Sequence, residues 1–367
     1  MPMPPITWQR QSARLLLDDS AVRADWDRLN DARLGVSFLC ADAVAAALAV
    51  FGGGAEQLFT ARADGRALAM FLLVPQGRLR WATFQPSQVP LGTWVAEPGP
   101  ALDELARALV RSGALGLCLA LSVSQVDPLQ AERADDAADN RHADYIPTSW
   151  LEVSGPFDAY WAARGKNLRQ NARKQRNKLA ADGIAASMRV LRGVADMAPA
   201  LARYGVIESA GWKAGRGTAI HPDNEQGRFY TRLLEGAAAR GEALVTEYLF
   251  GERTVAMNLG LLRGGTWVVL KTTYDESVGK ALSPASLLRE DELQFIFGGS
   301  EIRRIEYYGR TMEWHTKLTD SQRTLYHLTS YRWPLVKRLA ERRRERHEAV
   351  AAAAAPAPAA AAPAEAE

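Results

Sequence analysis

The chain has 367 residues, of which 47% are apolar and 24% are charged, and its formal net charge at pH 7 is +3. These values are typical of a globular protein long enough for two domains, and the charge is too small to indicate DNA binding. Cys40 and Cys118 match no metal-binding or redox spacing, and the five histidines form no metal-ligand pair. We therefore expect reduced thiols and no bound metal.

The start of the chain carries no predicted export or membrane segment. Residues 1–12 are polar and contain several prolines, without the apolar core of a signal peptide. The longest apolar stretch, residues 41–51, contains Asp42 and is too short to span a bilayer. We expect a cytoplasmic protein without a transmembrane segment.

Residues 44–121 are predicted to form a helix, a three-stranded meander, a second helix and a further strand. Apolar, partly β-branched runs indicate the strands, and Asp64-Gly65 and Gln76-Gly77 suit the turns between them. The predicted helices are 44–51 and 102–111, and the predicted strands are 57–63, 66–74, 79–84 and 115–121.

The same order of elements recurs in the second half of the chain. Residues 127–145, rich in Ala, Asp and Arg, are predicted to be the domain boundary or a mobile connection. The repeated order predicts a tandem of two similar folds. The predicted helices are 157–181, 194–207, 225–240 and 284–297, and the predicted strands are 244–250, 254–262, 267–273 and 302–308.

The last part of the chain is predicted to be a helix followed by a tail. Residues 333–348 carry a run of arginines interleaved with glutamates, which favours a solvated, salt-bridged helix over a nucleic-acid-binding arm. Residues 349–367 are nearly all Ala and Pro, and we expect them to be disordered.

The helix that follows the second meander has a distinctive start. Ser283 suits the N-cap and Pro284 suits the first helical position. A helix start presents unpaired backbone N–H groups and a partial positive charge, and these can bind phosphate. The pyrophosphate of an acyl carrier such as coenzyme A would fit such a seat, but most helix starts of this kind bind nothing, and the local sequence alone does not decide between the two.

A series of short motifs runs through the second half of the chain in a fixed order. They are Phe157, Tyr160, Arg169, Arg173 and Arg176, then Glu208 to Lys213, Lys271 to Asp275, Ser283-Pro284, and Tyr308-Gly309 through Lys317. With these motifs, residues 157–317 resemble the acyltransferase domain of the GCN5-related N-acetyltransferase (GNAT) superfamily. The most similar branch is that of the CelD-like proteins associated with cellulose biosynthesis, which are related to the Fem-type aminoacyltransferases. The family usually has Gly after Ser-Pro, where this chain has Ala285.

The resemblance implies an α/β (α+β) fold with two acetyltransferase-like units, each a mixed, mainly antiparallel sheet flanked by helices. It implies that the sheet of the second unit splays open after its fourth strand to hold acyl-CoA, while the first unit is a structural or acceptor-side lobe. We expect an N-terminal lobe at 1–145, an acyl-CoA-binding domain at 146–332, the basic helix at 333–348 and the tail at 349–367. The residues expected to hold the carrier are Tyr274, Ser283, Pro284, Ala285, Ser286 and Leu287.

Acyl transfer from a thioester to an amine needs a base and a polarised carbonyl, but no covalent nucleophile. Glu306 is the expected base, because strand alternation places it with Tyr308 on one face, where burial would raise its pKa. A structural carboxylate paired with Arg303 or Arg304 is an equal alternative. The remaining catalytic candidates are Tyr308, Lys271 and Asp275, with simple solvent exposure as the alternative for Lys271.

The acceptor side has its own candidate residues. Trp212 is also suited to sealing the core, and His315 to an idle surface position. The helix 157–181 carries more positive charge than helical pairing can neutralise, which favours an anionic acceptor, the adenosine phosphates or RNA, or a solvated surface. The expected acceptor-binding residues are Trp212, Lys213, Arg173, His315 and Lys317.

We therefore expect an enzyme that moves an acyl group such as acetyl from acyl-CoA to an amine of a sugar, an amino acid or a cell-envelope precursor. One alternative is a Fem-type transferase that uses aminoacyl-tRNA, in which the basic helix binds RNA. Another is a lobe without catalytic activity that binds its partners during polysaccharide assembly.

Overall fold

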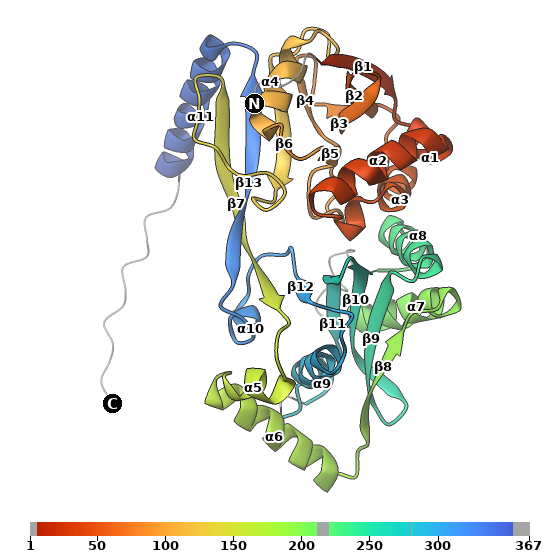
Figure 1. The fold of residues 1–367 in the computed structure, drawn as a ribbon. Helices are drawn as coiled ribbons and strands as arrows, with labels where there is room; N and C mark the ends of the chain where they lie inside the picture. The colour runs from red at the N-terminus through yellow and green to blue at the C-terminus, as the bar shows by residue number, and fades with distance from the viewer. Residues whose placement is uncertain (1–5, 211–219, 280, 355–367) are drawn as a thin grey trace.

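The computed structural model describes residues 6–210, 220–279 and 281–354. They form two lobes, which Figure 1 shows one above the other, and long strands run from one lobe into the other. The strands are β1 (Thr7–Ser12), β2 (Gln57–Ala63), β3 (Arg66–Pro75), β4 (Arg80–Thr83), β5 (Trp94–Ala96), β6 (Ala120–Val126), β7 (Asn140–Glu152), β8 (Ala186–Leu191), β9 (Ala243–Phe250), β10 (Arg253–Arg263), β11 (Thr266–Tyr274), β12 (Arg304–Glu306) and β13 (Gln322–Tyr331).

The helices cover both faces of this sheet. In the first lobe α2 packs on β3 and β5, and α4 packs on β6 and β13; in the second lobe α9 covers one face and α7 and α8 cover the other. The helices are α1 (Leu15–Asp18), α2 (Ser20–Arg33), the 3-10 turn η1 (Ser37–Leu39), α3 (Ala41–Phe51), α4 (Leu102–Arg111), α5 (Phe157–Ala162), α6 (Lys166–Ala181), α7 (Val194–Ala210), α8 (Glu225–Ala239), α9 (Pro284–Gly298), α10 (Glu313–Thr316) and α11 (Pro334–Ala354).

The two lobes exchange strands. Across the sheet the order is β1-β2-β3-β4-β6-β13-β7-β12-β11-β10-β9-β8, with β5 paired to β3. In each lobe the fourth strand has a parallel neighbour, β6 beside β4 and β12 beside β11. The next strand in space comes from elsewhere in the chain: β7, which follows the first lobe, pairs with β12, and β13, which follows the second lobe, pairs with β6. β7 and β13 also pair with each other, so the sheet is continuous through both lobes.

The lobes also share a buried core. One cluster of buried apolar side chains contains Trp26 and Val44 of the first lobe together with Tyr204 and Leu234 of the second. Helix α3 packs directly on α8 across this boundary. Burial of apolar surface in common fixes how the two lobes sit against each other.

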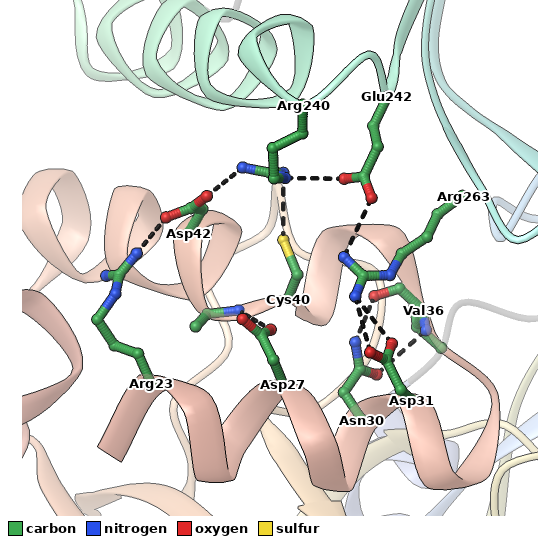
Figure 2. Close-up of polar contacts among 11 residues, drawn as sticks. Arg23, Asp27, Asn30, Asp31, Val36, Cys40, Asp42, Arg240, Glu242 and Arg263 are labelled. Atoms are coloured by element: carbon green, nitrogen blue, oxygen red, sulfur yellow. Dashed lines mark hydrogen bonds and ion pairs between the residues drawn. The ribbon is translucent and has the colours of Figure 1, made fainter. Parts of the chain in front are cut away.

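A network of arginines and carboxylates surrounds the contact between α3 and α8 (Figure 2). Arg240, just after α8, donates to Asp42 of α3 and, at 3.0 Å, to Glu242. Arg263, at the end of β10, donates to Asp31 of α2 at 2.8 Å and to Glu242 at 3.2 Å. These ion pairs therefore join the two lobes around the same contact between α3 and α8 that the apolar core forms.

The second-lobe meander forms as the sequence predicts. Gly251 and the pair Gly264-Gly265, at its two turns, have positive φ angles between 58° and 82°. A side chain disfavours this backbone conformation, so glycine allows the strands to reverse tightly. The predicted fold class, a tandem of mixed sheets flanked by helices, is confirmed.

Several elements differ from the sequence-based expectations. The predicted helix 157–181 is broken at residues 163–165 into α5 and α6, and α11 extends past residue 348 to Ala354, because alanine favours helix. Residues 355–367 lie outside the described part. The expected boundary at 145 falls inside β7, so residues 140–145 form a strand and not a mobile connection. Strands β1, β7, β8 and β13 and helix α2 were not predicted. Within the described residues, no helix is both long and apolar enough to cross a membrane.

Candidate functional site

The second-lobe sheet opens between β11 and β12. These parallel strands pair only from Thr266 with Arg304 to Val268 with Glu306. β11 continues to Tyr274 with β10 on its other side, so none of the described strands pairs with its far end on the β12 side. The predicted splaying after the fourth strand of this lobe is confirmed, and it leaves backbone groups of β11 facing an opening.

Helix α9 begins at this opening. Ser283 is its N-cap and Pro284 its first residue, as predicted. The Ser283 carbonyl accepts from the N–H groups of Ser286 and Leu287 at 3.0 and 3.1 Å, and the Ser283 and Ser286 hydroxyls lie 2.9 Å apart. The N–H groups of Ser283 and Ala285 have no acceptor among the described residues. Two donors and the positive end of the helix dipole therefore remain available.

A cavity of about 730 Å³, which we call the main cavity, lies in the opening. Helix α9 provides one wall, and the end of β11 with the loop that follows provides another. Its lining includes Glu208 of α7, Asn258 of β10, Thr272 to Glu276, Ser283 to Ala285, Arg289, Met312 and Trp314.

A second cavity of about 580 Å³, the side cavity, lies on the other side of the α9 start. Ser283, Arg289 and Trp314 line both cavities, so the helix start stands between them. The rest of its lining includes Trp161, Arg164, Asn167, Leu168, Asn171, Gln175, Ser286, Lys317 and Asp320. The Nε of Arg164 and the Oε1 of Gln175 are buried without a hydrogen-bond partner in the described protein.

Arg289 is the cation at the junction of the two cavities. Its guanidinium carbon lies 3.8 Å from the centroid of a Trp314 ring. It makes no hydrogen bond or ion pair with any residue that the structure describes. Burial lowers its pKa, although Tyr307, Glu292 and Tyr274 act in the other direction. An arginine held by an aromatic ring and without a carboxylate partner is suited to an anionic ligand.

Glu208 brings a buried carboxylate to the wall of the main cavity. Its side chain is almost fully buried, its Oε2 accepts from the Ile220 N–H at 2.7 Å, and its Oε1 lies 3.4 Å from the Nζ of Lys271. Burial and the Glu208 carboxylate raise the pKa values of the buried Tyr204 and Tyr230. The wall of the cavity therefore includes a guanidinium and a helix start from α9, and a carboxylate from α7 that Lys271 partners.

Glu306, the predicted base, lines neither large cavity. Its buried carboxylate accepts from Arg304 at 2.6 Å and from Arg323 at 2.9 Å. Burial raises its pKa, while the two guanidinium groups lower it. It lines a smaller cavity of about 100 Å³ with Tyr308 and residues 34–37 of the first lobe. Tyr308 is buried edge-to-face against Phe38.

Lys271 lies behind the main cavity, where its Nζ is 3.4 Å from Glu208 and 3.2 Å from Gln226. Tyr274 and Asp275 line the main cavity. Burial acts to raise the pKa of Asp275, but hydrogen bonds from Ser277 and Arg253 outweigh it and lower the pKa. Asp275 is therefore a weak base at neutral pH.

Most of the other residues predicted to bind the carrier or the acceptor line one of the two cavities, and one is buried in the apolar core. Ser283, Pro284 and Ala285 line the main cavity, and Ser286 and Lys317 line the side cavity. Leu287 is buried in the apolar core beneath α9. Trp212 and Lys213 lie outside the described residues.

His315 and Arg173 are placed away from both cavities. His315 is buried between Trp314 and Tyr307, and its Nδ1 accepts from the Met312 N–H. Burial and Arg289 lower the pKa of His315 to about 4. Arg173 is exposed on α6, whereas Arg176 on the same helix pairs with α9 through Glu290 and Asp291.

The corresponding helix start in the first lobe, that of α4, differs from that of α9 in its charged side chains. Asp103 accepts from Asn140 at 2.7 Å and lies 3.1 Å from the Nε2 of His142. Arg33 donates to the carbonyls of Glu97 and Pro100 just before this helix. The first turn of α4 thus carries the acidic side chains of Asp103 and Glu104, whereas the first turn of α9 carries none, so the start of α9 is better suited to an anion.

Comparison with known proteins agrees with this geometry. Residues 166–316 match the family model Acetyltransf_6, described as an acetyltransferase (GNAT) domain. The matched residues cover most of the second lobe. The GNAT part of the resemblance seen in the sequence is thereby confirmed, and a GNAT domain implies acyl-CoA as co-substrate. No curated protein matches the sequence.

Solved structures resemble both lobes together, at low sequence identity. The C-terminal domain (DUF2156) of a candidate lysylphosphatidylglycerol synthetase from Agrobacterium fabrum aligns with a TM-score of 0.52 and 13% identity, over 83% of this chain and 91% of that one. A conserved protein of unknown function from Bacteroides thetaiotaomicron aligns with a TM-score of 0.51 and 12% identity, over 90% and 99%. These likenesses show a shared fold that includes the first lobe.

The sequence-based prediction missed Arg289, Asn258 and Trp314. Helical spacing offered a signal for Arg289, since it follows Ser286 by three residues and therefore shares its face of α9. Asn258 is a polar residue within a strand of otherwise apolar inward-facing residues. Trp314 reaches the cavities through the chain path after β12, for which the sequence carries no local signal.

Proposed function

We propose that this protein transfers an acyl group from acyl-CoA to the amine of a small-molecule or cell-envelope precursor, such as a sugar or an amino acid. The observation that carries this proposal is the meeting of two cavities at the start of α9. Coenzyme A has the matching form, because its pyrophosphate joins a nucleotide arm to a pantetheine arm that ends in the thiol.

The pyrophosphate would lie at the junction of the cavities. Its donors would be the N–H groups of Ser283 and Ala285, which have no acceptor among the described residues, together with the Ser286 hydroxyl and the Arg289 guanidinium. Ala285 stands where the family usually has glycine, but its N–H points from the first turn as a glycine N–H would. A charge-assisted hydrogen bond from arginine adds to the pull of the helix dipole.

The two arms would occupy the two cavities. Pantetheine carries amides that can pair with the open edge of β11, which lines the main cavity near Tyr274. The nucleotide would occupy the side cavity, where Trp161 and Trp314 offer aromatic surface and Arg164 and Lys317 offer positive charge. The thioester would then lie in the main cavity, whose wall includes the Glu208 carboxylate.

Glu208 is the base that this geometry favours. It lines the main cavity, whereas Glu306 lines the small cavity beside the first lobe and is held by two arginines. Glu208 would take the proton of the amine as the amine attacks the thioester carbonyl. Lys271 would hold the Glu208 side chain in place from behind.

Titration calorimetry with coenzyme A tests the phosphate seat. A Ser286→Asp substitution puts a negative charge where the pyrophosphate would lie, and we expect it to weaken binding at least tenfold. Ser300→Asp is the matched control, since it adds the same charge at an exposed position just beyond the other end of α9. Equal affinity of the wild type and both variants would remove the seat and the proposal with it.

A transferase of the Fem type, using aminoacyl-tRNA, is a second candidate. The observation in its favour is the exposed basic surface of α6, which includes Arg169, Arg173 and Lys174. It predicts tRNA binding that weakens steeply with salt. Absence of tRNA binding at low salt, together with binding of coenzyme A, would eliminate this candidate. Coenzyme A binding without transfer to any amine in a broad screen would instead indicate a non-catalytic lobe.

A further inference from the structure

A row of polar side chains crosses the otherwise apolar sheet beneath α9. In the strand register Asn258 of β10 lies between Thr246 of β9 and Thr272 of β11. Residues paired across neighbouring strands point to the same face. Thr246 and Asn258 both reach Glu292 of α9, and Asn258 and Thr272 line the main cavity. The row therefore leads from a buried carboxylate into the cavity.

The hydrogen bonds of Glu292 decide which way the Asn258 side chain points. Glu292, only 4% exposed, accepts from the Thr246 hydroxyl at 2.5 Å. The Nδ2 of Asn258 lies 3.0 Å from each Glu292 oxygen. An ionised carboxylate has no proton to donate, so only the NH₂ end of the Asn258 amide can face it.

The oxygen end of Asn258 is then left for the cavity. Asn258 is 5% exposed and lines the main cavity, and its Oδ1 accepts no hydrogen bond from the described residues. The reversed amide would place a third acceptor against two carboxylate oxygens, which is costly in a buried site. The cavity thus presents a fixed hydrogen-bond acceptor on its sheet side and a carboxylate, Glu208, on its α7 side.

We propose that Glu292 is a positioning residue that holds the Asn258 side-chain oxygen toward the main cavity, where it accepts an N–H of the acceptor amine. The identity of the occupant as an acceptor amine rests on the proposed function; the orientation of Asn258 does not. An amine with two or more N–H groups can donate to Asn258 and Glu208 together, while an ether or a quaternary ammonium cannot. The arrangement would therefore select primary amines.

The orientation depends on the charge of Glu292, because a protonated carboxyl can donate to the oxygen of a reversed amide. Burial raises the pKa of Glu292 to about 7, while Thr246, Asn258 and Arg289 act to lower it. Tyr307 is the other titratable group that faces it, and burial keeps Tyr307 neutral well above this range. Below about pH 7, Asn258 is free to reverse.

Two variants separate orientation from packing. Glu292→Gln replaces the carboxylate by an amide, which accepts either orientation of Asn258. Thr246→Val is the matched control, since it also removes a hydrogen bond from Glu292 but leaves both contacts with Asn258 intact. The probes are methylammonium, which has N–H groups, and tetramethylammonium, which has the same charge and none. Their affinities are compared as a ratio, because the loss of charge at Glu292 affects both cations.

The measurement is a titration at pH 8.5 of protein carrying ¹⁵N-labelled asparagine, followed through the side-chain amide signal of Asn258. We expect the wild type and Thr246→Val to prefer methylammonium, and Glu292→Gln to lose at least fivefold of that preference. If Glu292→Gln does not fold, the wild type alone suffices, since its preference should fall as the pH drops below about 7. Equal affinity for the two cations in the wild type, or an unchanged ratio in Glu292→Gln and at low pH, would overturn the proposal. Calorimetry with coenzyme A is independent of this ratio, so failure of the proposed function would be seen separately.

Discussion

The Arg289 guanidinium lies on the ring of Trp314, 3.8 Å from its centroid, and both residues line both cavities. The ring comes from the segment after β12 and the arginine from α9, so their contact joins the two sides of the opening. With no carboxylate partner in the described residues, the cation is available to a ligand.

We expect Arg289→Gln to weaken coenzyme A binding by about tenfold to a hundredfold, since a hydrogen bond to a charged group contributes about 1.5–3 kcal/mol. Calorimetry measures this loss directly. Removal of the phosphates from the ligand should abolish the difference, so pantetheine should bind the wild type and the variant equally. A variant that binds coenzyme A as tightly as the wild type would show that Arg289 does not hold the phosphates.

Glu208 and Glu306 can be separated by matched substitutions. We expect Glu208→Gln to lower kcat by about 10²–10⁴, the range for loss of a general base, while affinity for coenzyme A stays the same. Glu306→Gln should retain turnover, because Glu306 lines only the small cavity beside the first lobe. The assay is thiol release from acetyl-CoA with an amine found by screening. Full turnover in Glu208→Gln, or its loss in Glu306→Gln, would return the role of base to Glu306.

The stability of the protein should depend on pH through Glu292. Its pKa rises from 4.5 to about 7 on folding, so the folded state binds a proton more tightly than the unfolded state. The contribution to stability is therefore complete below pH 4.5 and is lost as the pH rises through about 7. The full effect is about 3 kcal/mol. Urea unfolding of the wild type and Glu292→Gln at several pH values measures it as the difference between the two proteins. A difference that does not change between pH 4.5 and pH 8 would contradict the assignment.

Arg323 should be important for stability and not for catalysis. It is buried on β13 and donates to Asp127 at 2.6 and 2.8 Å and to Glu306 at 2.9 Å. Arg323→Leu would leave the buried Asp127 carboxylate without its cation and Glu306 with Arg304 alone, at a cost of roughly 3–5 kcal/mol in the free energy of unfolding. Arg310→Leu, at an exposed position, is the control and should change stability by less than about 0.5 kcal/mol. Equal denaturation midpoints for the two variants would show that the cluster contributes little.

The sequence predicted those features that depend on neighbouring residues. The second-lobe meander follows from apolar runs and glycine turns, and the start of α9 follows from Ser283 and Pro284. Strand alternation also predicted that Glu306 and Tyr308 share one face of β12, which leaves Ile305 and Tyr307 for the other face. Ile305 and Tyr307 do pack under α9, and the other pair faces the first lobe.

Features that depend on distant segments were not predictable in this way. Alternation cannot say which face of β12 meets the cavity, and the environment of Glu306 is set by Arg323, which β13 brings from outside the lobe. Trp314 lines both cavities together with residues far from it in the chain. The polar row beneath α9 likewise joins residues from three strands and a helix. Strand β7 has mixed polarity and contains Pro147, so its sequence resembles a connection more than a strand.

The exchange of strands has a consequence for how the protein is made. The first lobe leaves the ribosome without β13, the strand that belongs beside β6, and must wait for the rest of the chain to be synthesised before its sheet is complete. During that interval the edge of β6 is open to pairing with other nascent chains. Expression of the two lobes as separate polypeptides should therefore not give two folded halves. A chain that ends before residue 322 lacks β13, and we expect it to aggregate with its first lobe incompletely folded.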